Sequence, residues 1–415
     1  MSKIRLLLIN SPDSKDFDLE LSQRVQTIKE SPTLAVTARA AKLKAEGKDI
    51  IGLGAGEPDF DTPQHIKDAA KKAIDEGFTK YTPVAGIPSL KKAIVAKFKY
   101  ENGFEYTEKE VIVGVGGKQC IFNLALAVLN PGDEVIVPAP YWVSYADIAL
   151  VAGAKPVIIQ CDIEQGFKLT AAQLEAAITP KTKLFMINSP SNPTGAVYTL
   201  AELQALGEVL KRHPHILVAT DDMYEHVNLT GDKFCNILNA APELKPRCIV
   251  LNGVSKAYSM TGWRIGYAAG PAHIIKAMEI LQSQSTSNPT SISQVAAQAA
   301  LEGSQDCITP MVEAFRERHD YVVARFNQMR GIRCIAAGGA FYAFPDARVA
   351  ISNLHKAGKI AEASDMALSE YLLESAGVAV VPGSAFGAEG YFRVSFATSM
   401  DNLRNALDRI AKALA

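Results

Sequence analysis

Seven short apolar segments, rich in β-branched residues, recur through the middle of the chain. Most of them lack a strict alternation of apolar and polar positions, which is typical of strands covered on both faces of a sheet. Helical patterns lie between several of them, at Lys118–Leu129, Ala171–Ala177 and Leu200–Lys211. This alternation predicts a doubly wound, mostly parallel sheet. The predicted strands are Val111–Val115, Val135–Pro138, Lys155–Gln160, Lys183–Ile187, Ile216–Thr220, Cys248–Asn252 and Arg264–Ala268.

The pattern changes in the last third of the chain. Pro310–Arg330 has the spacing of a long amphipathic helix with charge along one face. Short strands and two further helices follow, an arrangement typical of an α+β unit. The predicted strands are Ala340–Phe344, Val378–Val381 and Phe392–Phe396, and the predicted helices are Glu362–Ser375 and Asp401–Leu414.

These patterns divide the chain into four parts. We expect residues 1–20 to be a flexible extension, since their apolar run is too short for a signal peptide. Residues 21–60 contain a helix, Thr33–Glu46, and a turn, Gly52–Pro58, and we expect them to join the C-terminal unit. Residues 61–305 are expected to form a large domain around the sheet, and residues 306–415 a smaller α+β domain.

Composition narrows the possible functions. Among 415 residues, 43 Lys and Arg stand against 44 Asp and Glu, which leaves no basic excess for a nucleic-acid backbone. No apolar run reaches the roughly 18 residues that a membrane span needs. The six cysteines are scattered without a C-x-x-C pair, and the histidines show no metal-ligand spacing. We therefore expect a reduced, cytoplasmic protein that binds neither nucleic acid, membrane nor metal.

A glycine-rich loop, Gly114–Gly117, closes one predicted strand and opens the helix that follows. Free backbone N–H groups at a helix start bind anions, so this loop can hold a phosphate. Gln119 stands where a dinucleotide fingerprint requires glycine and where a P-loop requires serine or threonine. Neither nucleotide class is therefore favoured, and a plain tight turn also explains the glycines.

Polar residues follow other predicted strands, at the ends where open α/β sheets bind ligands. The turn Asn188–Gly195 offers a rigidly held amide, and Asp221 and Asp222 end an apolar strand, where a carboxylate needs a partner. An ordinary loop and a helix N-cap are the plainer explanations. Arg393, in a late strand, is either a clamp for a carboxylate or part of a surface salt bridge.

The stretch from Asn252 to Gly266 is the richest in candidate chemistry. Partial burial would lower the pKa of Lys256 and favour its neutral, nucleophilic amine. Arg264 offers a planar fork for a phosphate. Taken alone, Lys256 also fits a surface lysine whose stem covers apolar neighbours. A phosphate cradle, an amide, an acid, a reactive lysine and two arginines together point to pyridoxal 5′-phosphate.

On these residues, the chain resembles the fold-type I, class I aminotransferases, most closely the aspartate aminotransferases of the prokaryotic type. The resemblance covers about residues 20–415. It rests on four motifs in the family's order: Ala55–Asp61, Lys80–Pro83, Asn188–Gly195 and Ser255–Arg264. It implies a large domain with a seven-stranded, mostly parallel sheet, a smaller α+β domain, and a homodimer with shared active sites.

The resemblance also implies roles around the cofactor, pyridoxal 5′-phosphate. Lys256 is expected to form the Schiff base with it. Asp221 is expected to pair with the pyridinium nitrogen, so that the ring can accept electrons. Trp142 is expected to stack on the ring, and Tyr224 and Asn192 to donate hydrogen bonds to its hydroxyl group.

The phosphate group is expected to meet the backbone of Gly117 and Lys118 and the guanidinium of Arg264. Tyr81 is expected to reach the phosphate of the other subunit. The chain departs from the family at Gly253, where members often have serine or threonine at the phosphate.

For the substrate, the resemblance implies that Gly56 and Arg393 hold the α-carboxylate, beside Trp142 and Asn192. Some aspartate aminotransferases bind the distal carboxylate with an arginine in the stretch that corresponds to residues 282–289, which contains none here. Lys118 and Thr33 match the residues that serve instead in the branch that the chain resembles.

The implied reaction moves an amino group between L-aspartate and 2-oxoglutarate and gives oxaloacetate and L-glutamate. Some members of the branch also use prephenate, so a bifunctional aspartate/prephenate enzyme stays open, as does another class I aminotransferase or a lyase on this fold. A cofactor-sensing regulator fused to a DNA-binding unit is disfavoured, since no helix-turn-helix pattern precedes the matching region.

Overall fold

The computed structural model describes residues 20–28, 30 and 32–415, and its largest element is a seven-stranded sheet. The strands are β2 (Val111–Gly114), β3 (Glu134–Ala139), β4 (Lys155–Gln160), β5 (Thr182–Asn188), β6 (Leu217–Asp221), β7 (Cys248–Gly253) and β8 (Gly266–Ala269). Their order across the sheet is β2-β8-β7-β6-β5-β3-β4. β8 runs antiparallel to both neighbours, and the other pairs are parallel.

All seven predicted strands belong to this sheet, which confirms the predicted α/β fold class. The predicted strand boundaries differ from the structure by at most one residue with one exception: β8 begins at Gly266 and not at Arg264. Arg264 has a left-handed backbone with a φ of 57°, a conformation that a strand does not contain. The preceding turn therefore extends to this arginine.

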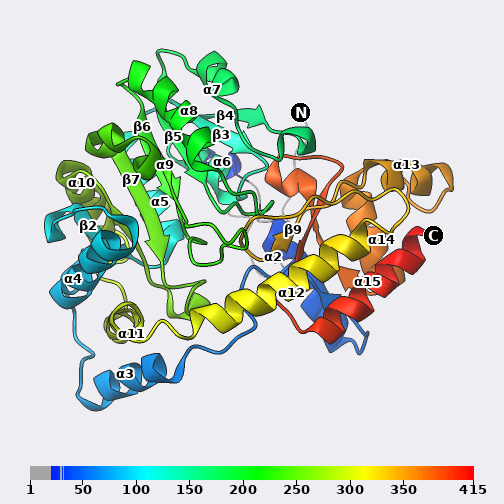
Figure 1. Ribbon diagram of the computed structural model, residues 1–415, viewed down its shortest axis with the longest axis horizontal. Coiled ribbons are helices and arrows are strands. Elements are labelled where there is room, and N and C mark those ends of the chain that lie inside the picture. Colours follow the sequence, from blue (N-terminus) through cyan, green and yellow to red (C-terminus); the bar gives the residue numbers. More distant parts are fainter. Residues whose placement is uncertain (1–19, 29, 31) are drawn as a thin grey trace.

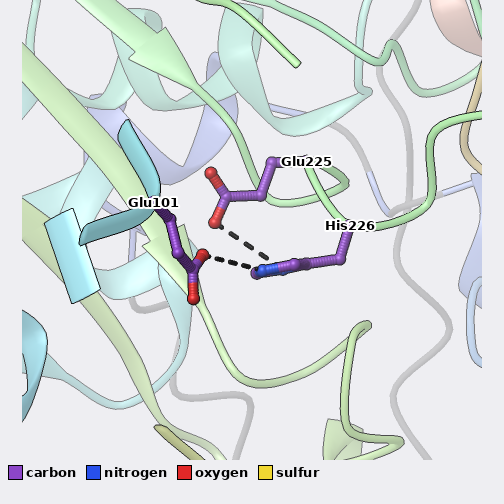
Figure 2. Close-up of side chains that lie close together, drawn as sticks. All are labelled: Glu101, Glu225 and His226. Carbon is purple, nitrogen blue, oxygen red and sulfur yellow. Dashed lines mark hydrogen bonds and ion pairs between the residues drawn. The ribbon is translucent and has the colours of Figure 1, made fainter. Parts of the chain in front are cut away.

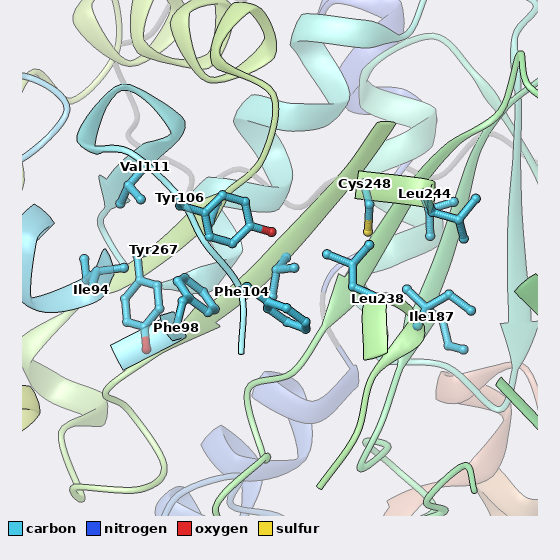
Figure 3. Close-up of a cluster of buried hydrophobic side chains, with 14 of the residues drawn as sticks. Ile94, Phe98, Phe104, Tyr106, Val111, Ile187, Leu238, Leu244, Cys248 and Tyr267 are labelled. Carbon is cyan, nitrogen blue, oxygen red and sulfur yellow. The ribbon is translucent and has the colours of Figure 1, made fainter. Parts of the chain in front are cut away.

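Alternating residues of the strands pack into two hydrophobic cores on opposite faces of the sheet. Along β7, Val250 lies in one core, and Ile249 and Leu251 lie in the other. Because both faces are covered, the strands show no polar alternation. One face carries α5 (Gly117–Val128), α6 (Ser144–Val151) and α10 (Ala272–Ser283). The other, partly drawn in Figure 3, carries α3 (Gln64–Asp75), α4 (Pro88–Lys97), α8 (Leu200–Arg212), α9 (Ile237–Ala240) and α11 (Ser291–Glu302).

The predicted helices of this region agree with the structure to within a residue at each end. They correspond to α5, α7 (Ala171–Ala177) and α8. α7 and α8 both begin with a capping box, in which a threonine side chain accepts from the backbone N–H three residues on.

The last third of the chain surrounds a further core, drawn at the right of Figure 1. The long helix α12 (Ile308–Phe326) runs from the sheet region into it and contributes Phe315 and Phe326. A three-stranded sheet, in the order β11-β12-β9, lies here. Its strands are β9 (Tyr342–Ala343), β11 (Val381–Pro382) and β12 (Phe392–Ser395), and its helices are α13 (Arg348–Lys356), α14 (Asp365–Ala376) and α15 (Met400–Leu414).

An early segment of the chain pairs with this last third. β1 (Ile51–Gly52) runs parallel to β10 (Val378–Ala379), after the helix α2 (Pro32–Ala45). The single strand predicted at Val378–Val381 is wrong, because its residues divide between β10 and β11, which belong to different sheets. The domain limits at residues 20, 60 and 305 stay predictions.

The predicted extension, residues 1–20, lies outside the described part of the chain except for its last residue. The short helix α1 (Gln23–Gln26) follows it. In the described ranges, no helix combines the length and apolar character that crossing a membrane requires.

Candidate active site

A cavity of about 260 Å³ opens where the carboxyl ends of the parallel strands meet the C-terminal unit. All but two of the residues predicted to form the site line it. They are Gly56, Gly117, Lys118, Trp142, Asn192, Asp221, Tyr224, Lys256, Arg264 and Arg393.

The two exceptions are Tyr81 and Thr33. Tyr81 is 92% exposed and does not line the cavity of its own chain. Thr33 lies in α2, but its side chain is outside the described part of the structure. The predicted roles of both residues stay predictions.

Lys256 follows β7 and extends into the cavity. Its Nζ donates a hydrogen bond of 2.5 Å to the backbone carbonyl of Gly56. Burial, helped by the positive charge of Arg393, lowers the pKa of Lys256 to about 8. The amine is therefore more easily deprotonated than that of a surface lysine, and the surface interpretation is wrong.

Asp221 ends β6 and is buried beside the cavity. The hydroxyl group of Tyr145 donates to its Oδ2 at 2.5 Å, and the backbone N–H of Met223 donates to its Oδ1 at 3.2 Å. Burial raises the pKa of this carboxyl, while these hydrogen bonds and the charge of Lys256 oppose the rise. A turn follows Asp221, so the N-cap explanation is wrong.

Arg393 lies in β12 and is only 2% exposed, which rules out a surface salt bridge. Its Nη1 donates to the side-chain oxygen of Asn192 at 2.9 Å, and its Nη2 donates to the carbonyl of Gly54 at 2.7 Å. Its Nε has no hydrogen-bond partner among the described residues. A buried guanidinium that lines the cavity is a ready partner for a carboxylate.

The start of α5 and Arg264 form a second place for an anion. Gly116 precedes the helix with a φ of 80°, and a Cβ atom there would lie 2.3 Å from a nitrogen of the Arg264 guanidinium. Glycine thus lets the guanidinium approach the first N–H groups of the helix, where anions bind favourably. At Gly253, a Cβ would lie 3.1 Å from Gly266 Cα, so a larger residue would crowd β8.

Lys118 lies in the first turn of α5, and its Nζ is 5.0 Å from the centroid of the Trp142 ring. Burial and the charge of Arg264 lower the pKa of this lysine. Trp142 in turn packs edge-to-face against Tyr145, with ring centroids 5.3 Å apart. The lysine charge is therefore held at one wall of the cavity.

Among the lining residues that were not predicted as site residues, three have side chains that form hydrogen bonds with predicted ones. Tyr145 bonds to Asp221 as described above, and the hydroxyl groups of Tyr342 and Tyr224 lie 2.8 Å apart. Asn188 donates to the backbone carbonyl of Asp221 and accepts from the N–H of Asn192. Asn188 opens the predicted polar turn, a signal that could have singled it out, whereas no pattern distinguished the two tyrosines.

Two acidic residues and a histidine form a group outside the cavity, and two of the three directly follow Tyr224 in the chain. Figure 2 shows Glu101, Glu225 and His226 facing one another, as the ligands of a metal would. The ammonium of Lys97 already bonds to Glu225 and lies 3.4 Å from Glu101. We interpret the group as an ion-pair network that ties the segment after Tyr224 to α4 and the π-helix Phe98–Asn102.

Comparison with known proteins gives a consistent result. Residues 48–410 match the family "Aminotransferase class I and II". The aspartate/prephenate aminotransferase of Nitrosomonas europaea is 65% identical over 95% of this chain and 100% of its own. The aspartate aminotransferase of Rhizobium meliloti is 51% identical over 96% of this chain and 97% of its own.

Solved structures agree. The Rhizobium meliloti enzyme superimposes with a TM-score of 0.90 at 50% identity, over 95% of this chain and 99% of that one. The aspartate aminotransferase of Thermus thermophilus with maleate gives a TM-score of 0.88 at 44% identity, over 95% and 100%. This chain is therefore an aminotransferase and belongs to the class I and II aminotransferase family.

Proposed function

We propose that this aminotransferase transfers the amino group of L-aspartate to 2-oxoglutarate and uses pyridoxal 5′-phosphate as its cofactor. The observation that carries the proposal is the pairing of Lys256 and Asp221 in one cavity, between two separate places for anions. The names of the relatives at 65% and 51% identity support the choice of aspartate.

The residues of the cavity fit this cofactor and an amino-acid substrate. The glycine-lined start of α5 with Arg264 suits a phosphate, and the guanidinium of Arg393, which lines the cavity, suits a carboxylate. When bound, pyridoxal phosphate supplies a carbonyl group that takes up the substrate's amine and a ring that accepts electrons from its α-carbon.

Asp221 keeps the ring nitrogen protonated in this proposal. Its carboxylate is oriented by the hydroxyl of Tyr145 and the N–H of Met223, so both oxygens are held before any ligand arrives. A buried carboxylate gains most from a cation that it can contact directly, which makes a protonated ring nitrogen its natural partner.

Lys256 is the residue that moves the proton. With a pKa of about 8, it is neutral in about a tenth of molecules at pH 7, far more often than an ordinary lysine. A neutral amine can take the proton from the substrate's α-carbon and give it up again at the cofactor, as a base whose pKa is close to the working pH does best.

The substrate is held at both ends. Arg393, with Gly56, binds the α-carboxylate, and Lys118 binds the distal carboxylate with help from Thr33. A lysine is a point charge rather than a fork, so it accepts diacids of different shapes. The 65% identity to an aspartate/prephenate aminotransferase favours prephenate as a second amino acceptor.

We further propose a homodimer in the cytoplasm. The exposed Tyr81, which lies away from the cavity of its own chain, supports a role at the phosphate of a second subunit. The six free cysteines fit a reducing compartment. Sedimentation and cell fractionation test these two points, and a fully active monomer would refute the role of Tyr81.

The test of the function is the absorbance spectrum of the protein with bound cofactor, recorded while amino acids are added. Conversion of the cofactor to its amine form by both aspartate and arogenate, the amino counterpart of prephenate, would support the bifunctional enzyme. Conversion by aspartate alone would restrict the function to aspartate. No conversion by either would refute the proposed substrates, and turnover by Lys256→Ala would refute the proposed base.

A further inference from the structure

The segment Gly54–Asp61 meets the two cations that the proposed reaction needs most. The carbonyl of Gly54 accepts from Arg393, and the carbonyl of Gly56 accepts from Lys256. A Cβ on Gly56 would lie 3.0 Å from the hydroxyl of Tyr342, so the backbone passes close to the cavity wall. The position of this segment therefore affects both the carboxylate-binding arginine and the reactive lysine.

Regular secondary structure does not hold this segment in place. β1 ends at Gly52 and α3 begins at Gln64. Among the described residues, the hydrogen bonds of positions 54–61 all involve a side chain on one of the two partners. The segment depends on side-chain contacts for its path.

The strongest of these contacts is an ion pair between Asp59 and Arg318 of α12. Both nitrogens at the end of the guanidinium donate to the carboxylate, at 2.7 and 3.0 Å. The side chains of Arg318 and Asp59 are 13% and 28% exposed, so the pair is partly shielded from water. A two-point contact of this kind fixes orientation as well as distance.

Two neighbouring aromatic rings pack against the guanidinium of this pair. The guanidinium of Arg318 lies 5.3 Å from the ring centroid of Phe60 and 5.7 Å from that of Phe315. The two rings also pack edge-to-face with centroids 5.7 Å apart. Phe315 is fully buried in the C-terminal core, so the segment is attached to a rigid body.

We propose that Asp59 and Arg318 are positioning residues for the substrate's α-carboxylate. They act through the path of Gly54–Gly56, which sets where Arg393 and the backbone of Gly56 meet the carboxylate. The inference rests on the proposed function, because it assumes that this end of the cavity takes the α-carboxylate. In this proposal, Asp59 and Arg318 influence substrate binding although neither residue lines the cavity.

The test compares Asp59→Asn with wild type, both with bound cofactor. We expect KM for aspartate and the dissociation constant of maleate, a dicarboxylate, to rise about 5- to 20-fold, as the loss of a shielded ionic hydrogen bond implies. kcat should stay within about twofold, because Lys256 and Asp221 are positioned mainly by β7 and β6 and not by this segment. Arg318→Lys keeps the charge without the fork, so it should fall between wild type and Asp59→Asn.

The same helix provides a matched control. Arg325 of α12 donates to Asp408 at 2.8 Å, with side chains that are 28% and 55% exposed, away from the cavity. Asp408→Asn should leave KM, maleate affinity and kcat unchanged. Equal losses in Asp408→Asn and Asp59→Asn, or an unchanged maleate affinity in Asp59→Asn, would overturn the positioning role. A wild-type protein that neither binds maleate nor uses aspartate would instead refute the proposed function.

Discussion

Replacing Lys256 with methionine should stabilise the cofactor-free protein at neutral pH, although it removes the reactive amine. Methionine has a similar unbranched shape and no charge. Burial lowers the pKa of Lys256 from 10.5 to about 8, which means that the folded protein disfavours the ammonium form. At pH 7 the lysine is nevertheless mostly protonated, so wild type carries an unfavourable charge that the variant lacks.

The size of the gain follows from the same pKa. Each pKa unit corresponds to about 1.4 kcal/mol, so the fall in the pKa of Lys256 from 10.5 to about 8 corresponds to about 3 kcal/mol. In wild type, the ammonium faces an open cavity, and it donates a hydrogen bond to Gly56 that methionine cannot replace. Both effects reduce the gain in the free energy of unfolding to about 2 kcal/mol.

The gain should depend on pH in a defined direction. Below pH 8 the lysine is protonated in both the folded and the unfolded chain, and the full difference is present. Between about pH 8 and 10.5 the unfolded chain binds more protons than the folded one, so the stability of wild type rises with pH. Above 10.5 both forms are neutral and the difference disappears.

Urea unfolding of the cofactor-free proteins at pH 7, 8, 9 and 10 measures this difference. Lys412→Met, at an exposed position of α15, is the control and should show no such trend. A Lys256→Met protein less stable than wild type at pH 7, or a difference that stays constant up to pH 10, would refute the reasoning.

Three further changes test separate parts of the site. Lys118→Ala should raise KM for aspartate about tenfold while barely affecting a monocarboxylic amino acid, because only the distal carboxylate loses its partner; equal losses in steady-state assays would contradict this. Gly116→Ala should weaken pyridoxal phosphate binding in fluorescence titrations, since its Cβ would lie 2.3 Å from a guanidinium nitrogen, whereas Gly132→Ala, with a similar φ of 92° and open space around it, should not. Tyr145→Phe removes a hydrogen bond that lowers the pKa of Asp221, so the acid limb of kcat/KM against pH should move to higher pH; an unmoved limb would count against it.

The large sheet was predictable because its strands are short and apolar and are separated by helices, of which α7 and α8 begin with capping boxes. The sequence of residues 378–382, Val-Ala-Val-Val-Pro, shows why the C-terminal strands were harder. The run is uniformly apolar, yet β10 pairs with β1 and β11 pairs with β12. The boundary between β10 and β11 is therefore decided by the strands with which they pair. One of these, β1, lies more than 300 residues earlier in the chain.

The residues that line the cavity were predictable wherever a residue type and its motif suggest the chemistry, as for Lys256 and Arg393, whose roles stay predictions. Tyr145 and Tyr342 escaped prediction because their importance lies in hydrogen bonds to Asp221 and Tyr224, which arise only when distant segments meet. Neither residue stands out by composition or spacing, and a buried tyrosine is ordinary in a core.

The charges of the cavity explain why a diacid suits it. Lys118, Lys256, Arg264 and Arg393 line it, and Asp221 is the only carboxylate among the lining residues of the described chain. Opposite charges that meet in a cavity within the protein attract more strongly than in bulk water, so this positive excess favours bound anions. A phosphate beside Arg264 and two carboxylates between Arg393 and Lys118 would balance it. An apolar side chain in place of the distal carboxylate would leave the Lys118 ammonium at the cavity wall without the anionic partner that a diacid supplies, which disfavours monocarboxylic amino acids as substrates.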